Sequence, residues 1–119
     1  MPRNISFSLT TGQIRNRSKT VTRRRGWRDL RPGAILNACR KCMGLKPGEK
    51  IEKLATIRVV DVTREPLSEM VSSVGYGRAE ARLEGFPGIT GDEFVEMFCS
   101  HMGGDRDQEV TRIEFEYVD

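Results

Sequence analysis

Positively charged side chains crowd into residues 15–31, around the only tryptophan of the chain, Trp27. This stretch contains a single acid, Asp29, and its last cation is Arg31. Cations beside a flat aromatic ring suit a polyanion that also carries stackable bases. The residues that we expect to contact nucleic acid are Arg15, Arg17, Lys19, Arg23, Arg24, Arg25, Trp27 and Arg28. The alternative is a basic face that only meets solvent.

The middle of this stretch, residues 19–24, alternates β-branched and polar side chains, which predicts a strand. In a strand, Lys19 and Arg23 point to one face, while Thr22 and Arg24 point to the other. A β-bulge would change which side chains share a face. The strand therefore presents two separate sets of polar groups.

A second group of reactive side chains has the residue types of a zinc site, namely Cys39, Cys42, Cys99 and His101. Cys-x-x-Cys followed by Gly44 is compatible with a metal knuckle, but Cys-x-His is an unusual spacing for the other half. Cys99 also falls on an apolar helical face, where cysteine commonly serves as a core residue. We therefore expect no metal and no other cofactor, and no stoichiometric zinc in the purified protein.

Length and composition predict one domain over residues 1–119, with a modest hydrophobic core. The sequence has no apolar run of membrane-spanning length and no signal-peptide core at its N-terminus, so we expect no membrane contact. Three cysteines, an odd number, do not form a disulfide framework. A cytoplasmic location is the natural expectation. The oligomeric state is not predicted.

Charge is distributed unevenly along the chain, although the net charge is only +3. Residues 1–53 hold 14 of the 20 Lys and Arg residues but only 3 of the 17 acids, so their net charge is +11. The net charge of residues 54–119 is −8. Such polarity predicts one basic surface. Contacts between the two halves could equally neutralise it.

The secondary structure expected from periodicity and capping signals begins and ends with strands. Strands are expected at residues 4–9, 19–24, 34–42, 55–62 and 109–118. Helical segments are expected at residues 10–14, 27–30, 66–71, 78–86 and 90–102, with residues 43–50 as a loop and residues 72–77 without regular structure. Thr90 and Glu93 form a capping box at the start of the clearest helix. This order predicts an α+β fold, a small barrel of five or six strands with short flanking helices.

The chain resembles the ASCH domains, which have a PUA-like barrel fold and include small stand-alone versions in bacteria and phages. The matching segments are Lys-Thr-Val-Thr-Arg-Arg at 19–24, Leu-Arg-Pro-Gly at 30–33, Arg64-Glu65, Glu84-Gly85-Phe86 and the final Ile-Glu-Phe strand at 113–115. Lys19 and Arg24 match the Lys and Arg of the family signature Gly-x-Lys-x-x-Glu-x-Arg. Arg17 and Thr22 stand where its Gly and Glu would be.

A threonine in that last place is similar to the members that resemble N4-acetylcytidine amidohydrolase. That branch uses a lysine, a threonine three residues on and a distant glutamate, which implies a catalytic set of Lys19, Thr22 and Glu84. A threonine hydroxyl needs a base, and a lysine can serve once burial and neighbouring cations such as Arg23 and Arg24 lower its pKa. Glu84 would trade protons with the leaving amine, and Gly85 would let it turn toward a pocket.

Three functions remain open at this point. The first is binding of nucleic acid, RNA in preference to DNA, or of a modified nucleoside in a basic cleft. The second is hydrolysis of an N4-acylated cytidine-type base. The third is a phage protein-interaction module that uses the acidic half. A purely structural alternative also stands: Lys19 and Arg24 bind phosphate, Thr22 packs in the sheet and Glu84 pairs with an arginine.

Overall fold

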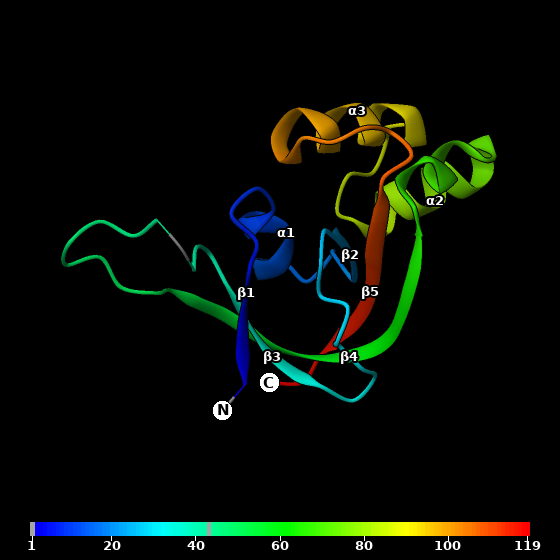
Figure 1. The fold of residues 1–119 in the computed structure, drawn as a ribbon. Coiled ribbons are helices and arrows are strands. Elements are labelled where there is room, and N and C mark those ends of the chain that lie inside the picture. Colours follow the sequence, from blue (N-terminus) through cyan, green and yellow to red (C-terminus); the bar gives the residue numbers. More distant parts are fainter. Residues whose placement is uncertain (1, 43) are drawn as a thin grey trace.

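A single strongly curved sheet supports the fold, and the two longest helices gather over one end of it (Figure 1). The computed structural model describes residues 2–42 and 44–119. Its strands are β1 (Arg3–Ser6), β2 (Val21–Arg24), β3 (Ile35–Cys39), β4 (Lys53–Pro66) and β5 (Glu109–Tyr117). Its helices are α1 (Thr11–Arg15), the 3₁₀ helix η1 (Leu67–Val71), α2 (Val74–Leu83) and α3 (Gly91–Met102). The expected α+β class is confirmed.

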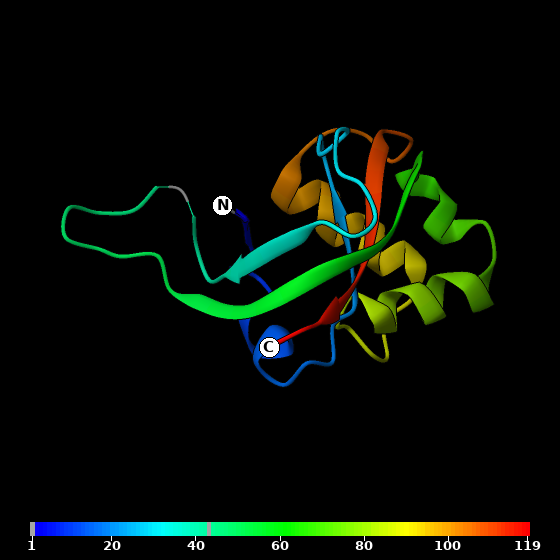
Figure 2. The same ribbon diagram turned by 90° about the horizontal axis from the view of Figure 1, so that it is seen from below.

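The sheet has the strand order β1-β3-β4-β5-β2, in which only the described pair β1–β3 is parallel. The long strand β4 bends steeply, and its register with β5 shifts between Val59 and Asp61 (Figures 1 and 2). Such an irregularity increases local twist and curls the sheet. The result is a half-barrel. Its edge strands, β1 and β2, do not pair through backbone atoms within the described residues, but the Arg24 guanidinium donates to the Ser6 carbonyl across the gap.

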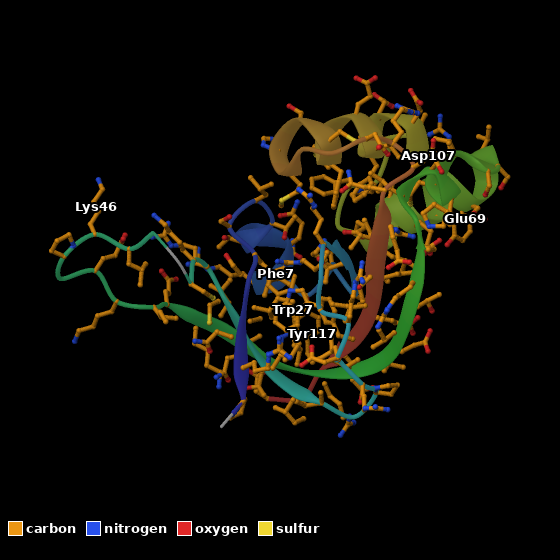
Figure 3. All side chains as sticks on the ribbon, viewed as in Figure 1. Phe7, Trp27, Lys46, Glu69, Asp107 and Tyr117 are labelled. Atoms are coloured by element: carbon orange, nitrogen blue, oxygen red, sulfur yellow. The ribbon has the colours of Figure 1, made fainter. Side chains whose placement is uncertain are left out.

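Two hydrophobic clusters lie on either side of the polar groups considered below. The first fills the inside of the curved sheet, where Phe7 packs on Phe115 with ring centroids 5.8 Å apart (Figure 3). The second lies between the helices and the end of the sheet, and its members include Met70, Phe94 and Phe98. The polar residues at their junction are therefore enclosed by apolar packing from both sides.

Two expected segments were assigned wrongly. Residues 27–30 form a turn, closed by a bond from Leu30 N to Trp27 O, and not a turn of helix. Residues 74–77 are the first turn of α2, which Ser73 caps. Glycine lowers helix propensity, which is why Gly75 and Gly77 favoured an irregular segment. Tertiary packing overrides this, because a Cβ at Gly77 would lie 2.3 Å from the Met70 carbonyl oxygen.

The connection between β3 and β4 projects away from the rest of the chain (Figure 2). Residues 40–42 and 44–52 lie in this connection, and the expected strand at residues 34–42 is shorter than predicted because β3 ends at Cys39. In the part of the chain that the structure describes, no helix combines the length and the apolarity needed to cross a membrane.

Candidate active site

A cavity of about 190 Å³ opens where the two hydrophobic clusters meet. Its charged lining comes from β2, from Lys19 just before β2 and from Glu84 after α2. Its apolar lining comes from α3, from the segment after α2 and from the segment that follows β1. The lining residues are Ser6, Phe7, Ser8, Leu9, Thr10, Lys19, Thr22, Arg23, Arg24, Glu84, Phe86, Phe94, Met97, Phe98, His101 and Met102. Lys19, Thr22 and Glu84 thus line one cavity, although Glu84 is far from the other two in sequence.

Lys19 and Glu84 form a buried ion pair at this cavity. The Lys19 Nζ lies 2.8 Å from Glu84 Oε1 and also donates to the Glu84 carbonyl oxygen at 2.7 Å. Glu84 follows α2 directly, and Gly85 then adopts a φ of +101°, which a side chain would strain. A Cβ at Gly85 would also lie 2.8 Å from Gln13 Cγ. This turn aims Glu84 inward, as the sequence predicted.

Thr22 belongs to a different hydrogen-bonded pair. Its Oγ1 accepts a bond of 3.0 Å from Arg24 Nε, which agrees with the prediction that Thr22 and Arg24 share a face of the strand. The Arg24 guanidinium also lies over the Phe7 ring, 4.7 Å from its centroid. Among the described residues, the partners of Lys19 Nζ do not include Thr22. The expected Lys–Thr contact is therefore not made in this structure.

Arg23 joins the pair to a larger buried ionic network. Its guanidinium lies 3.0 Å from Glu84 Oε2, 2.6 Å from Glu80 Oε1 and 3.4 Å from Glu65 Oε1, with its side chain 1% exposed. Arg112 completes the network by two bonds to Glu80, of 2.6 and 3.1 Å. Burial raises the pKa of Glu80, but hydrogen bonds from Arg112 and Arg23 outweigh it, so this pKa falls below 4.5.

Burial also determines the acidity of the cavity cations. It lowers the pKa of Lys19 below 10.5, an effect that Glu84 opposes and that the charges of Arg24 and Arg23 reinforce. Burial likewise lowers the pKa of Arg24 to about 10, so its guanidinium stays charged at neutral pH. A lysine that gives up its proton more readily is suited to act as a base.

The sequence analysis missed two parts of this site. Glu80, Glu65 and Arg112 come from three separate elements, so no local spacing points to the network that they form. The apolar wall includes Phe94 and Phe98, whose helical spacing indicated only a core face. Their ring centroids are 6.5 Å apart, and both rings line the same cavity as Lys19, Arg23 and Glu84. Only the combination of both walls makes the cavity suited to a flat polar ligand.

Many cations expected on a basic face are bound by the acidic half instead. Arg23 and Lys19 are buried with carboxylates, and Arg24 is largely covered. Further out, Arg17 pairs with Asp119 at 2.8 Å, Arg28 pairs with Glu109 at 3.5 Å, and Arg25 donates to the Met102 carbonyl. Arg15 pairs with Glu52, an acid of the basic half itself. Much of the charge asymmetry is thus neutralised within the molecule.

Trp27 is half-buried, and its ring is already in contact with a cation. The Arg3 guanidinium lies 4.3 Å from the ring centroid, and Arg3 also pairs with Asp29 at 3.2 Å. Trp27 has a φ of +55°, a conformation unfavourable for a residue with a side chain. Packing of the indole against the core cluster of the sheet stabilises this conformation.

The four candidate zinc ligands are not gathered in the structure. Within residues 2–42 and 44–119, no group of three or more His, Cys, Asp or Glu side chains could hold a metal ion. Cys39 is buried in β3, Cys99 packs beside the cluster under the helices, and His101 lines the cavity. Burial and the neighbouring Cys42 raise the pKa of the Cys39 thiol to about 11, which keeps it protonated.

No protein-family model matches the chain, and no curated protein matches it. Among solved structures, it is similar to protein EF3133 from Enterococcus faecalis V583, which is described as DUF984. The TM-score is 0.61 at 19% sequence identity, and the match covers 100% of this chain and 77% of that one. This likeness supports the small half-barrel fold and does not extend to an activity.

Proposed function

We propose that the chain is an ASCH-type domain with a PUA-like barrel, and that its cavity binds and deacylates an N4-acylated cytidine-type nucleoside. The observation that carries this proposal is the meeting of Lys19, Thr22 and Glu84 at one cavity. These are the residue types that the family resemblance requires, and they come from segments 62 residues apart in sequence (22 to 84). A structural role alone does not require a cavity at this place.

The size and polarity of the cavity suit a single base. Its volume of about 190 Å³ is below that of sites for drug-sized ligands, which are roughly 300–1,000 Å³. The rings of Phe94 and Phe98 offer an apolar wall for a flat heterocycle. The charged side chains that line the cavity are Lys19, Arg23, Arg24 and Glu84. Arg24 forms no ion pair among the described residues, so its guanidinium can attract a carbonyl oxygen or a developing oxyanion.

The proposed reaction replaces the amide nitrogen of the substrate by water in two steps. Lys19, in its neutral form, takes the proton of the Thr22 hydroxyl, and Thr22 Oγ1 attacks the acyl carbon. Arg24, which already donates to that oxygen, lies close to the charge that develops. Glu84, which has taken a proton from Lys19 within their ion pair, delivers it to the departing amine, and an ester on Thr22 remains. Water then attacks this ester with Glu84 as base, Lys19 returns the proton to Thr22 Oγ1, and the carboxylic acid leaves.

This sequence of steps requires one rearrangement. Lys19 donates to Glu84 before substrate enters, so it must pass this proton to Glu84 and turn toward Thr22 once the acylated base occupies the cavity. Catalytic hydrogen bonds are often incomplete in ligand-free enzymes and form only in the substrate complex. The buried ion pair is therefore the resting arrangement of the proposed site.

The test is a chromatographic assay of cytidine release from N4-acetylcytidine. Wild-type protein should release cytidine, and Thr22→Ala should lower kcat by about 10³-fold or more while the dissociation constant changes only a few-fold. Thr20→Ala is the matched control, because Thr20 does not line the cavity. Thr22→Ser retains a hydroxyl and should recover part of the activity. Failure of the wild type to release cytidine, or full activity of Thr22→Ala, would refute the mechanism.

Nucleoside binding without hydrolysis is the second candidate function. It is favoured by the hydrogen bonds of the resting site, in which Lys19 and Thr22 already have partners, Glu84 and Arg24. The same assay separates the two candidates when combined with calorimetry. A protein that binds N4-acetylcytidine and never releases cytidine is a binding module.

A further inference from the structure

A second hollow lies beside the proposed base site. Ser6, Ser8, Lys41 and Cys42 line it, and its volume is about 440 Å³. Ser6 and Ser8 also line the first cavity, so the two spaces adjoin along the segment that follows β1. A base alone does not use this second space.

The groups around the second hollow suit a phosphate. Lys41 supplies an ammonium and Ser8 supplies a hydroxyl donor, while no carboxylate belongs to its described lining. An ammonium forms charge-assisted hydrogen bonds to phosphate oxygens, and a nearby hydroxyl adds a further donor. Ser6 has a different role, because its Oγ already donates to the Arg40 carbonyl at 3.3 Å and so holds the segment after β1 against the base of the projecting connection.

The projecting connection of residues 40–52 adds positive charge next to this hollow. Among the described residues, Lys41, Lys46 and Lys50 form no ion pair, in contrast to most cations of residues 15–31. Lys46 lies at the far end of the projection (Figure 3), and Lys41 lies at its base beside the hollow. This hairpin therefore adds ammonium groups without carboxylate partners that can attract an anion to the second hollow.

We propose that the second hollow is a phosphate subsite, so that the cavity pair takes a nucleotide, the phosphate ester of the modified nucleoside, in preference to the free nucleoside. This inference rests on the proposed function for the position of the base. The phosphate belongs either to a 5′-monophosphate or to one link of an RNA strand, because both present the same anionic oxygens to Lys41.

The test compares cytidine with cytidine 5′-monophosphate by calorimetry, so that no turnover interferes. The monophosphate should bind wild-type protein about tenfold more tightly at low salt, and added salt should reduce this preference. Lys41→Gln should abolish the preference. Lys50→Gln, on the same hairpin but outside the hollow, is the matched control and should retain it. Equal affinities for the two ligands in the wild type would overturn the inference, as would an unchanged preference in Lys41→Gln.

Two further measurements make the outcome unambiguous. Cytidine monophosphate should slow iodoacetamide labelling of Cys42 in wild-type protein, whereas cytidine should not; equal labelling with both ligands counts against the subsite. A short oligoribonucleotide identifies the source of the phosphate, because Lys46→Gln weakens its binding only if an RNA strand follows the hairpin. With either source the subsite is supported.

The failure of this inference can be distinguished from failure of the proposed function. Hydrolysis of N4-acetylcytidine without any preference for the monophosphate overturns the subsite alone. A preference for the monophosphate without hydrolysis supports the subsite and overturns the deacylase. Absence of binding by cytidine and its monophosphate, together with no release of cytidine from N4-acetylcytidine, overturns both.

Discussion

Replacement of Arg23 by methionine tests the buried network most directly. Methionine fills a similar volume without charge, so the change removes the ionic contacts while it keeps much of the packing. The side chain of Arg23 is 1% exposed, and it bonds to Glu84 and Glu80 at 3.0 and 2.6 Å. Water therefore cannot take its place without opening the core.

The expected loss in the free energy of unfolding of Arg23→Met depends on the partners that Glu84 and Glu80 retain. Removal of one member of a buried ion pair typically costs about 3–5 kcal/mol. Glu84 keeps Lys19 at 2.8 Å and Glu80 keeps Arg112 at 2.6 Å, so we expect the lower end, about 3 kcal/mol. A domain of this size has a total stability of about 6–18 kcal/mol, which makes this a large fraction. The melting temperature should fall by about 12 °C.

Urea unfolding at neutral pH measures this loss, with Arg28→Met as the matched control. Arg28 also faces a carboxylate, that of Glu109 at 3.5 Å, but its side chain is 69% exposed. Exposed pairs of this kind contribute about 0–1 kcal/mol. A double variant, Arg23→Met with Glu84→Gln, should lose less than the sum of the two single changes, because the unpaired carboxylate has been removed.

The reasoning is refuted if Arg23→Met unfolds within about 0.5 kcal/mol of Arg28→Met, the usual range of surface substitutions. Strictly additive losses in the double variant would likewise show that Arg23 and Glu84 do not interact. Either result would mean that the network does not hold the carboxylate of the proposed site in place.

Three other measurements follow from the same structure. If Lys19 acts as a base in its neutral form, kcat/KM should rise with pH with a midpoint below 10.5, and a flat profile would exclude this role. Because the pKa of Glu80 is depressed, its stabilising contribution is present above pH 4.5 and is lost as pH falls through the folded-state pKa. Acid unfolding monitored by circular dichroism should therefore be less steep in Glu80→Gln. Gly91→Ala should destabilise by about 3 kcal/mol, since its Cβ would lie 1.9 Å from the Met70 carbonyl, whereas Gly12→Ala meets no atom within 4 Å and should stabilise slightly in a thermal melt.

Local patterns were sufficient for most secondary structure. The alternation in β5 and the β-branched run in β4 predicted strands that the structure confirms, and the capping box of Thr90 and Glu93 begins α3 as expected. These signals act between residues a few positions apart, so they are readable in the sequence. The first turn of α2 was not readable, because the close approach of Gly77 to Gly91 is a contact between two helices.

The sequence by itself determined the residue types of the site and the inward turn of Glu84 at Gly85. It did not determine which of the cations pair with carboxylates. The run of cations predicted one basic surface, because a sequence shows only which residues are neighbours along the chain. The carboxylates that neutralise several of these cations come from the other half of the chain. Only the tertiary structure brought Lys19, Thr22 and Glu84 to one cavity and placed Lys41 at the second hollow, without an ion pair among the described residues. The physical reason is that ion pairing and burial depend on distance in space and not on sequence separation.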